Sequence, residues 1–277
     1  MAALPTIAIV AGSGALPELL ADICRAKGQR CVVVAFDGVF LDWSGNHTVI
    51  AARFEKLGAM FDALQKAGVS AAVFAGAMRR PTLDLTDLDE TSTGLLAALA
   101  AGDDTTLRAA ARLFEDAGIT VLAPHDLAPM LLAGSGPLGR HRPAPADTAD
   151  IMRATEIVAA LGLVDIGQAA VVVQGLCLGL ESLQGTDAML GFVADTVQGL
   201  RPDPNGAKGV LFKAAKPGQD RRLDLPAIGP DTIDAAHRAG LAGVAVQTGG
   251  VMILDMAETI RRADHLGLFL TGVEGRS

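Results

Sequence analysis

The sequence has no tyrosine, one tryptophan and only 4% aromatic residues among its 277 residues. This scarcity argues against single-stranded nucleic acid as a ligand, because proteins that bind it stack the bases on aromatic side chains. Cations are also in the minority, since 23 Lys and Arg stand against 31 Asp and Glu, a formal net charge of −8. An acidic chain binds nucleic-acid phosphates poorly, although cations gathered in one place can hold a small anion. We therefore expect no nucleic-acid partner.

The sequence also lacks the roughly 20 continuous apolar residues that a membrane-spanning helix needs, despite a mean hydropathy of +0.37. The first ten residues contain neither a basic segment nor a long apolar one, so we expect no secretory signal. Cys24, Cys31 and Cys177 lie in apolar contexts without metal-ligand spacing, which favours buried thiols in a reducing compartment. Together these features predict a cytoplasmic globular protein.

Strand-like and helix-like segments alternate along the first half of the chain. Strands separated by helices of about 10–15 residues predict βαβ units and a mainly parallel sheet. We therefore expect a Rossmann-like, nucleotide- or phosphate-binding domain over residues 1–133. The pattern predicts strands at 7–11, 31–36, 48–52, 71–75 and 119–123 and helices at 16–27, 54–66 and 107–117.

Glycine and proline punctuate residues 134–149, which predicts a linker or an ordered crossing loop. Alternation then resumes in a second α/β domain over residues 150–277, which we expect to be the catalytic domain that binds a lipid-sugar phosphate. The predicted fold class is α/β with two domains and a ligand cleft between them, a favoured place for ligands. The pattern predicts helices at 148–161, 187–200, 232–239 and 256–263 and strands at 169–174, 176–181, 210–214, 244–247, 251–254 and 268–272.

A glycine-rich turn connects the first predicted strand to the first predicted helix. Gly12, Ser13 and Gly14 form this turn, and Leu16 and Pro17 begin the helix. The free N–H groups and positive dipole end of a helix suit a phosphate. The pattern approaches the G-x-G-x-x-G fingerprint of dinucleotide sites, but Pro17 stands in place of the third glycine. A phosphate contact and a plain tight turn both remain open.

Two further motifs of the first half carry charge. Gly76, Arg79 and Arg80 follow a strand, at the edge where open parallel sheets bind ligands, and arginine can clamp a phosphate with two bonds. Asp103 and Asp104 precede a helix, which they can cap, or they can hold Mg²⁺. Two solvated arginines that begin a loop are the alternative interpretation of the first motif.

The second half opens with Arg140, His141 and Arg142, which gather cations in the linker or serve as part of a hinge. Further along, Thr248 and Gly249 lie in a tight turn between two predicted strands. This turn either offers backbone N–H groups to a ligand or closes a β-hairpin. Polar residues also flank the strands from 169 to 181, and Thr186 or Asp187 can cap the helix that follows. We count Gln168, Glu181, Thr186 and Asp187 as candidate ligand-binding residues.

The densest cluster of charges follows the strand at 210–214. Cations of this kind neutralise a phosphoanhydride, while a carboxylate can hold Mg²⁺ or orient water. Asp224 stands out because it lies between Leu223 and Leu225, and an acid among apolar residues needs a partner. A salt-bridged acid in the core is the alternative. The charged residues of this loop are Lys213, Lys216, Asp220, Arg221, Arg222 and Asp224.

These motifs resemble the LpxI-type UDP-2,3-diacylglucosamine pyrophosphatases of Gram-negative lipid A synthesis. The resemblance includes AGAMRRP, GDDTTLR, GRHRPAPADTADI and KAAKPGQDRRLDLPAIGPDTI, in the order of the family. It implies Mg²⁺-dependent hydrolysis of UDP-2,3-diacylglucosamine to UMP and 2,3-diacylglucosamine 1-phosphate (lipid X), two domains around the ligand, and a homodimer. The family's essential acid falls on Asp224, which we expect to act with Lys213 and Arg221. Asp103 and Asp104 are further candidates for holding the metal.

The implied substrate is a membrane lipid, so the resemblance also implies transient contact with the cytoplasmic face of the inner membrane. Its acyl chains need an apolar tunnel or cleft, where each buried CH₂ contributes about 0.8 kcal/mol. The resemblance favours attack on the β-phosphorus. One departure is Gln174, where we expect relatives to carry an acid, and Glu181 or Asp187 are candidate replacements. A nicotinamide-dependent oxidoreductase and a non-catalytic carrier are the competing hypotheses.

Overall fold

The computed structural model describes residues 5–78, 82–99 and 103–274. It divides into two compact units. The N-terminal unit comprises residues 1–129 together with 220–224, and the C-terminal unit comprises residues 130–219 and 225–277. The predicted two-domain α/β fold is confirmed. The segment with the predicted essential acid belongs by its contacts to the N-terminal unit, although it lies far along the sequence.

A five-stranded parallel sheet forms the centre of the N-terminal unit, in the order β3-β2-β1-β4-β5. Near-continuous apolar runs form its central strands, as expected for strands buried on both faces. The order reverses between β1 and β4, so the switch point of this Rossmann-like sheet lies at their carboxyl ends. The strands are β1 (Thr6–Ala11), β2 (Cys31–Phe36), β3 (Thr48–Ala52), β4 (Val69–Ala75) and β5 (Thr120–Leu122).

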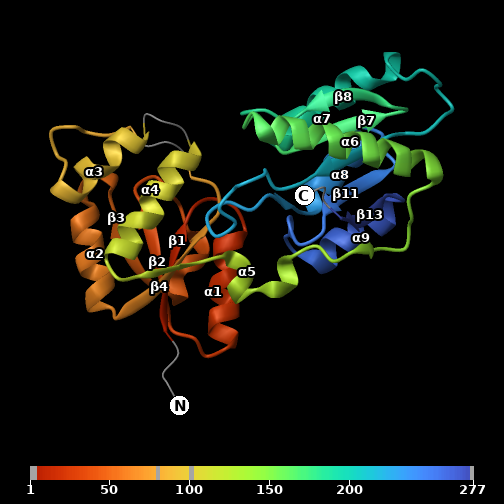
Figure 1. Cartoon of the computed structure of the whole chain (residues 1–277). Helices are drawn as coiled ribbons and strands as arrows, with labels where there is room; N and C mark the ends of the chain where they lie inside the picture. Colours follow the sequence, from red (N-terminus) through yellow and green to blue (C-terminus); the bar gives the residue numbers. More distant parts are fainter. Residues whose placement is uncertain (1–4, 79–81, 100–102, 275–277) are drawn as a thin grey trace. The chain divides into compact units, whose positions relative to one another are not determined.

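Helices cover both faces of this sheet (Figure 1). Helices α2, α3 and α4 pack their apolar sides on one face, and α1 packs on the other. The helices are α1 (Leu16–Ala26), α2 (Leu57–Lys66), α3 (Glu90–Leu99), α4 (Asp103–Asp116) and α5 (Pro124–Leu127), with 3₁₀ turns η1 (Asp42–Asn46), η2 (Phe54–Lys56) and η3 (Pro129–Leu131).

The C-terminal unit contains a mixed six-stranded sheet in the order β6-β13-β11-β9-β7-β8. Strands β9, β11 and β13 are parallel, whereas β6, at one edge, and β7 run antiparallel to their neighbours. A separate parallel pair consists of β10 and β12. The strands are β6 (Gly136–Pro137), β7 (Ala169–Val173), β8 (Leu176–Leu180), β9 (Val210–Lys213), β10 (Ala227–Ile228), β11 (Gly243–Gln247), β12 (Met252–Ile253) and β13 (Phe269–Val273).

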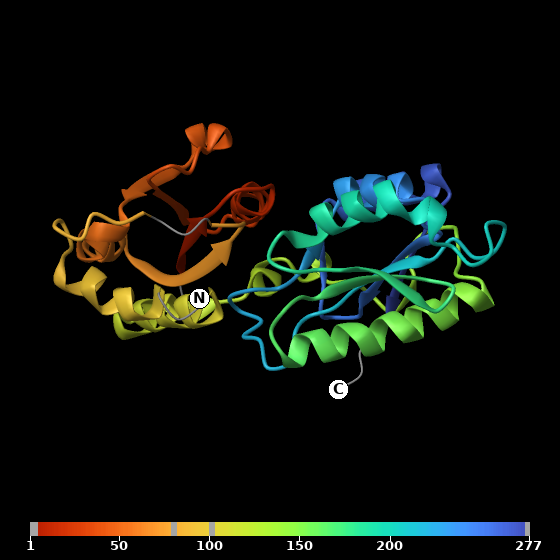
Figure 2. The ribbon, with the colours of Figure 1, turned by 90° about the horizontal axis from the view of Figure 1, so that it is seen from above.

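Figure 2 shows α6 on one face of the mixed sheet and the other helices of this unit on the opposite face. Side chains alternate between the two faces, as strand geometry requires. Val171 of β7 packs on the α7 and α8 side, whereas Val172 packs on the α6 side. The helices are α6 (Pro145–Leu163), α7 (Gly185–Thr196), α8 (Pro230–Arg238) and α9 (Met256–Leu266), with the 3₁₀ turn η4 (Val197–Gly199).

Two interpretations of the sequence need correction. Of the two alternatives for the turn at Thr248 and Gly249, the β-hairpin is wrong, because β11 and β12 belong to different sheets. All three cysteines are free thiols, but only Cys24 is buried as expected, whereas Cys31 is half-buried and Cys177 is exposed. Its strand, β8, lies at the edge of the mixed sheet, where Leu176 and Cys177 face outward. Within the described residues, no helix combines the length and the apolarity needed to cross a membrane.

Candidate active site

The loops that follow β1 and β4 are joined by backbone hydrogen bonds at the switch point of the parallel sheet. The N–H of Gly12 donates to the carbonyl of Ala75 at 2.7 Å, and that of Ser13 donates to Ala77 at 2.8 Å. A Cβ on Gly12 would lie 2.4 Å from the Ala77 carbonyl oxygen, so this approach requires glycine. The amides of Gly12 and Ser13 are therefore engaged within the unit. The exposed Gly14 follows them in the predicted ligand loop.

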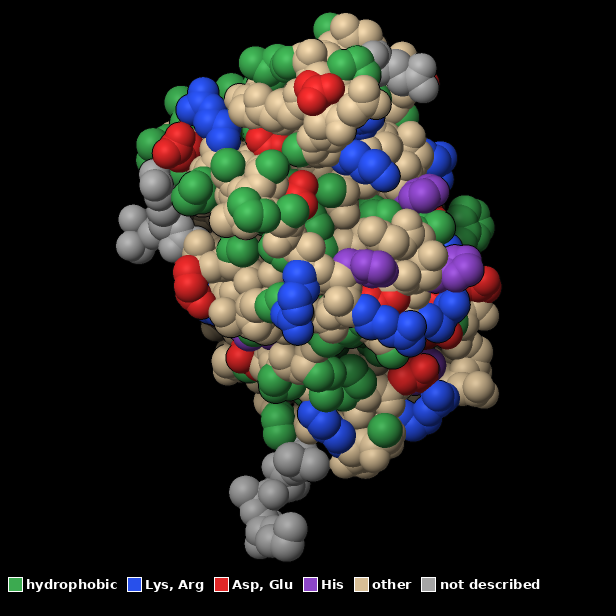
Figure 3. All heavy atoms as spheres, turned by 90° about the vertical axis from the view of Figure 1, so that its right-hand side faces the viewer, with side chains coloured by type: hydrophobic (Ala, Val, Ile, Leu, Met, Phe, Trp, Pro, Cys, Tyr) green, Lys and Arg blue, Asp and Glu red, His purple; other side chains and the backbone are tan. Residues whose placement is uncertain are grey.

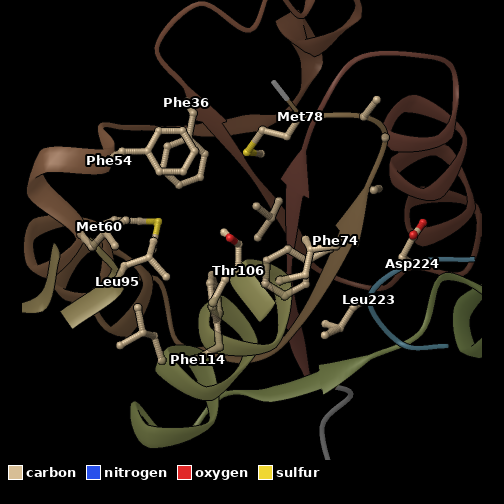
Figure 4. Close-up of a pocket in the computed structure, with 18 of the residues that line it drawn as sticks. Phe36, Phe54, Met60, Phe74, Met78, Leu95, Thr106, Phe114, Leu223 and Asp224 are labelled. Atoms are coloured by element: carbon tan, nitrogen blue, oxygen red, sulfur yellow. The ribbon is translucent and has the colours of Figure 1, made fainter. Parts of the chain in front are cut away.

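An apolar cavity of about 330 Å³ lies in the N-terminal unit at the carboxyl edge of the parallel sheet. Its volume falls within the range of roughly 300–1,000 Å³ that is typical of ligand pockets. Gly76 and Ala77 of the β4 loop contribute to its wall, as do residues of η2, α2, α3 and α4 (Figure 4). The predicted contact residue Gly76 therefore borders a real cavity, whereas Leu16 is buried at the start of α1.

Five of the nine phenylalanines in the chain line this cavity. Phe36 and Phe54 are stacked with their ring centroids 4.1 Å apart, and Phe114 contacts Phe61 and Phe74 edge to face at 5.0 and 5.3 Å. These rings come from five different elements, and the sequence pattern of each element indicates burial without indicating a void. Sequence reasoning therefore called for an apolar cleft but did not locate this one.

The turn at residues 220–224 packs onto the N-terminal unit beside the cavity. The Leu223 side chain is buried in the core of this unit. Arg222 connects the turn to α4. Its guanidinium pairs with Asp220 of the turn at 2.7 Å and with Glu115 of α4 at 2.8 Å. Hydrogen bonds from Arg222 lower the pKa of Asp220, and those to Asp220 and Glu115 raise the pKa of Arg222. Both groups therefore stay charged at neutral pH.

Asp224 lies at the margin of the cavity with its side chain exposed. Figure 4 shows Leu223 and Asp224 on one side of the cavity and Phe36 and Phe54 on the other. Asp224 faces outward between two buried leucines, so the interpretation of this residue as a core acid is wrong. Arg221, the second predicted catalytic residue of this segment, is also exposed.

For four other candidate residues of the N-terminal unit, the position of the side chain is not described. Arg79 and Arg80 lie outside the described residues. Asp103 and Asp104 are the first two residues of α4, and their side chains lie outside the described part of the structure. Their candidate roles therefore stay predictions.

In the C-terminal unit, three predicted site residues form one buried hydrogen-bonded chain. The Lys213 ammonium donates to the Thr186 hydroxyl at 2.7 Å, and that hydroxyl donates to a Glu181 carboxylate oxygen at 3.1 Å. Lys213 ends β9, Glu181 follows β8 and Thr186 lies in the first turn of α7. The exposed fractions of Lys213, Thr186 and Glu181 are 7%, 9% and 7%. The structure thus brings together residues that lie up to 32 positions apart in the sequence.

Further polar groups lie at the same edge of the mixed sheet. Gln168 precedes β7, and its carbonyl accepts from the N–H of Ala214 at 2.9 Å. Thr248 follows β11, whose Val246 is the register partner of Lys213. The N–H of Gly249 donates to the carbonyl of Ala133 at 3.0 Å, so that amide is engaged within the unit. Gln168, Thr248 and Lys213 therefore share the carboxyl edge of β9.

Two other candidate ligand-binding residues, Lys216 and Asp187, lie apart from these buried groups. The ammonium of Lys216 pairs with Asp165 at 2.7 Å. Asp187 lies exposed in the first turn of α7, where a negative charge suits the helix dipole. Neither belongs to the buried chain of Lys213.

The sequence matches two family descriptions that together span almost the whole chain. The LpxI N-terminal domain matches residues 6–139, and the LpxI C-terminal domain matches residues 134–271. The UDP-2,3-diacylglucosamine pyrophosphatase LpxI of Caulobacter vibrioides is 39% identical over 277 residues, which cover 97% of each chain. The chain belongs to the LpxI family. The resemblance stated from its motifs is therefore confirmed.

Solved structures offer more distant comparisons with this LpxI-family chain. The WbmG enzyme of Bordetella bronchiseptica in complex with NAD is 16% identical, with a TM-score of 0.28, over 43% of this chain and 36% of that chain. The precorrin-6A reductase CobK is 14% identical, with a TM-score of 0.34, over 99% of this chain and 89% of that chain. Similarity at this level carries no argument about function.

Within the LpxI C-terminal domain, the structure separates Arg140 from Lys213. The backbone N–H of Arg140 donates to the carboxylate of Asp264 at 2.6 Å, near the end of α9 and the start of β13. Lys213 lies at the end of β9, which shares its direction with β13 through β11. Arg140 therefore lies at the amino ends of the parallel strands of the mixed sheet, and Lys213 lies at their carboxyl ends. Cationic and acidic side chains lie close together on the face of the molecule in Figure 3.

Gln174, where we expect relatives to carry an acid, has a structural role in this chain. Gln174 and Gly175 form the turn between β7 and β8, and both backbone N–H groups donate to the buried carboxylate of Asp150. The side-chain amide of Gln174 bonds the backbone of Asp203 and Ala207. Strand β7 separates this turn from Lys213. Gln174 therefore stabilises a turn at the edge of the sheet that lies away from the buried chain.

Proposed function

We propose that this LpxI-family chain hydrolyses the pyrophosphate bond of UDP-2,3-diacylglucosamine and releases UMP and lipid X. Membership in the family and the name of the Caulobacter vibrioides relative, a UDP-2,3-diacylglucosamine pyrophosphatase, support the choice of substrate. The observation that carries the proposal is the position of Asp224, an exposed carboxylate at the margin of an apolar cavity. A lipid-linked anhydride needs both a polar reacting group and an apolar binding surface, and they lie side by side in the N-terminal unit.

The reaction exchanges one P–O bond for another. The oxygen of a water molecule bonds to one phosphorus as the bridging P–O bond breaks, and the bridging oxygen leaves with the other phosphate. A proton from the water passes to solvent or to a carboxylate such as Asp224. Negative charge increases at the phosphate oxygens in the transition state, so nearby cations accelerate the reaction. Arg221, next to Asp224 in the sequence, is the proposed cation of this segment.

Magnesium is the proposed cofactor, and Asp224 suits it. Among the described residues, no three His, Cys, Asp or Glu side chains converge as a complete protein metal site. Magnesium enzymes that act on phosphates commonly supply one or two carboxylates, and water and substrate oxygens complete the coordination. Asp224 provides one such carboxylate, and Asp103 and Asp104 remain further candidates. The bound ion would neutralise charge on the phosphate oxygens.

The apolar cavity is the proposed binding place for an acyl chain. Its walls are almost entirely Phe, Leu, Met and Ala side chains, which offer a methylene chain the transfer free energy of burial. Because the substrate resides in a bilayer, we also propose transient contact with the cytoplasmic face of the inner membrane. We propose in addition that the protein is cytoplasmic and that it forms a homodimer.

We expect that filling the cavity will weaken binding of long acyl chains. Ala110 lines the cavity from α4, and the substitution Ala110→Phe places a ring in that space. The KM for UDP-2,3-diacylglucosamine should rise about tenfold, which corresponds to the loss of about two buried CH₂ groups. Hydrolysis of an analogue with two acetyl groups should change less than about twofold, because short chains do not reach this depth.

The matched control is Arg112→Phe, which adds a ring at an exposed position of the same helix. Steady-state kinetics with both substrates would compare the two variants. An equal effect of Ala110→Phe on the long-chain and acetylated substrates would contradict the assignment of this cavity to an acyl chain.

Isotope labelling tests which phosphorus is attacked. In ¹⁸O-enriched water, attack at the β-phosphorus places one heavy oxygen in lipid X and leaves UMP unlabelled, because the bridging oxygen departs with UMP. We expect this result, and mass spectrometry of both products detects it. Label in UMP would show attack at the α-phosphorus.

A further inference from the structure

The buried chain of Lys213, Thr186 and Glu181 raises a physical question. An ammonium ion in a protein interior is unfavourable unless another group compensates its charge. Glu181 supplies the opposite charge, but its carboxylate contacts the Thr186 hydroxyl, which lies between it and Lys213. A charge pair serving stability alone gains most from direct contact, because the attraction weakens as distance grows.

The intermediate hydroxyl has a second consequence. Thr186 accepts a hydrogen bond from Lys213 and donates one to Glu181. Because the hydroxyl has a single proton, the hydrogen bonds run in one direction, from the ammonium through the hydroxyl to the carboxylate. The hydroxyl fixes the place of the ammonium, and the carboxylate in turn fixes the hydroxyl. Such an arrangement holds a cation in one position, as precise binding of a phosphate group requires.

Two buried oxygens at the same edge of the sheet point to a ligand. The side-chain oxygens Oε1 of Gln168 and Oγ1 of Thr248 are buried, and neither has a hydrogen-bond partner among the described residues. Buried polar atoms without partners are rare in native proteins, and a bound ligand explains them. The Thr248 hydroxyl can donate to a phosphate oxygen, whereas the amide oxygen of Gln168 can only accept from a donor on the ligand. Gln168 and Thr248 flank the end of β9, which carries Lys213.

We propose that Glu181 and Thr186 are positioning residues that fix the charged Lys213 ammonium where it binds a phosphate group of the substrate. The identity of that substrate rests on the function proposed above, whereas the positioning role rests on the buried chain. Glu181 and Thr186 thus act through Lys213, which differs from their predicted role as direct substrate ligands. Lys213 is the residue that contacts the anion.

The test combines two nearly isosteric variants with one conservative variant. Glu181→Gln removes the charge, Thr186→Val removes the hydroxyl, and Thr186→Ser keeps the hydroxyl. We expect the KM for UDP-2,3-diacylglucosamine to rise at least about tenfold in the first two variants, with kcat changed less than about threefold. Thr186→Ser should retain a KM within about threefold of the unsubstituted protein. Increased KM in Thr186→Ser equal to that in Thr186→Val would contradict the role of the hydroxyl.

Matched controls separate positioning from general damage. Thr196→Val removes a hydroxyl from the same helix, α7, where it bonds a backbone carbonyl, and Glu156→Gln removes an exposed carboxylate of α6. Both should leave KM unchanged. Thermal unfolding of every variant shows whether it is folded, and Thr186→Ser still provides a test if Thr186→Val is not.

Calorimetric titration with inorganic pyrophosphate distinguishes this proposal from the function on which it rests. We expect Glu181→Gln and Thr186→Val to bind pyrophosphate at least about tenfold more weakly than the unsubstituted chain. Weakened binding without any hydrolysis of UDP-2,3-diacylglucosamine would overturn the proposed function and support the positioning role. Normal hydrolysis with unchanged KM and unchanged pyrophosphate binding in both variants would overturn the positioning role alone.

Discussion

Asp224→Asn should reduce kcat for UDP-2,3-diacylglucosamine by about 10³-fold, a loss typical of removing a group that stabilises a charged transition state. The carboxylate is exposed at the margin of the apolar cavity, so its removal leaves the packing of Leu223 and the ion pairs of Arg222 in place. The melting temperature should therefore stay within about 2 °C, because exposed charges contribute little to stability. Steady-state kinetics and thermal unfolding measure the two effects separately.

Asp62→Asn is the matched control, because Asp62 is an exposed acid on α2. It should leave both kcat and the melting temperature unchanged. Loss of activity in Asp224→Asn together with a large fall in the melting temperature would contradict a catalytic role, since it would show that the acid stabilises the fold. Retention of full activity would contradict it directly.

Gly76→Ala should lower the free energy of unfolding of the N-terminal unit by at least about 3 kcal/mol. Gly76 has a φ of +86°, and an added Cβ would lie 2.3 Å from the carbonyl oxygen of Ser13. The loops after β1 and β4 would have to separate, and the hydrogen bonds between Ser13 and Ala77 would be lost. Because Gly76 also lines the apolar cavity, activity should fall as well. Chemical denaturation followed by circular dichroism measures the change in stability.

Gly94→Ala provides the comparison for this substitution. Gly94 lies exposed in the middle of α3, and an added Cβ would meet nothing within 4 Å. Alanine is the better helix former, so stability should stay the same or rise by up to about 1 kcal/mol. Equal stability of Gly76→Ala and Gly94→Ala would contradict the close approach of the two loops.

The regular parts of the fold could be predicted because their signals are local. The strands at Cys31–Phe36 and Thr48–Ala52 have the predicted bounds, since each is a run of apolar or β-branched residues between turn residues. Helix α3 was missed because Thr91, Ser92, Thr93 and Gly94 favour helices weakly. Its start carried a usable signal, since Asp89 accepts a hydrogen bond from the N–H of Ser92 in the manner of a helix cap.

The weakest local signals belong to β6 and β10, each of which has two residues. Strand β6 is Gly136–Pro137, and both residue types are unfavourable in strand interiors. It forms because the edge of β13 supplies hydrogen-bond partners, a tertiary contact that no local pattern reveals. Residues 134–149, which predicted a linker or an ordered crossing loop, therefore contain part of the mixed sheet and the start of α6.

The candidate site was predictable residue by residue but not as an arrangement. The resemblance to the family pointed to Asp224, but its membership of the N-terminal unit depends on the contacts of Leu223 and Arg222. Lys213, Thr186 and Glu181 were each singled out, but their order in a buried chain comes from the pairing of β7 with both β8 and β9. Long-range strand pairing of this kind is absent from the periodicity of a single sequence.

The most direct measurement incubates the purified chain with UDP-2,3-diacylglucosamine and Mg²⁺ and follows UMP and lipid X by mass spectrometry. The account predicts equal amounts of both products over many turnovers, little product after chelation of the metal, and about 10³-fold slower release by Asp224→Asn. Tight binding of the substrate without any release of UMP would contradict it and would indicate a carrier.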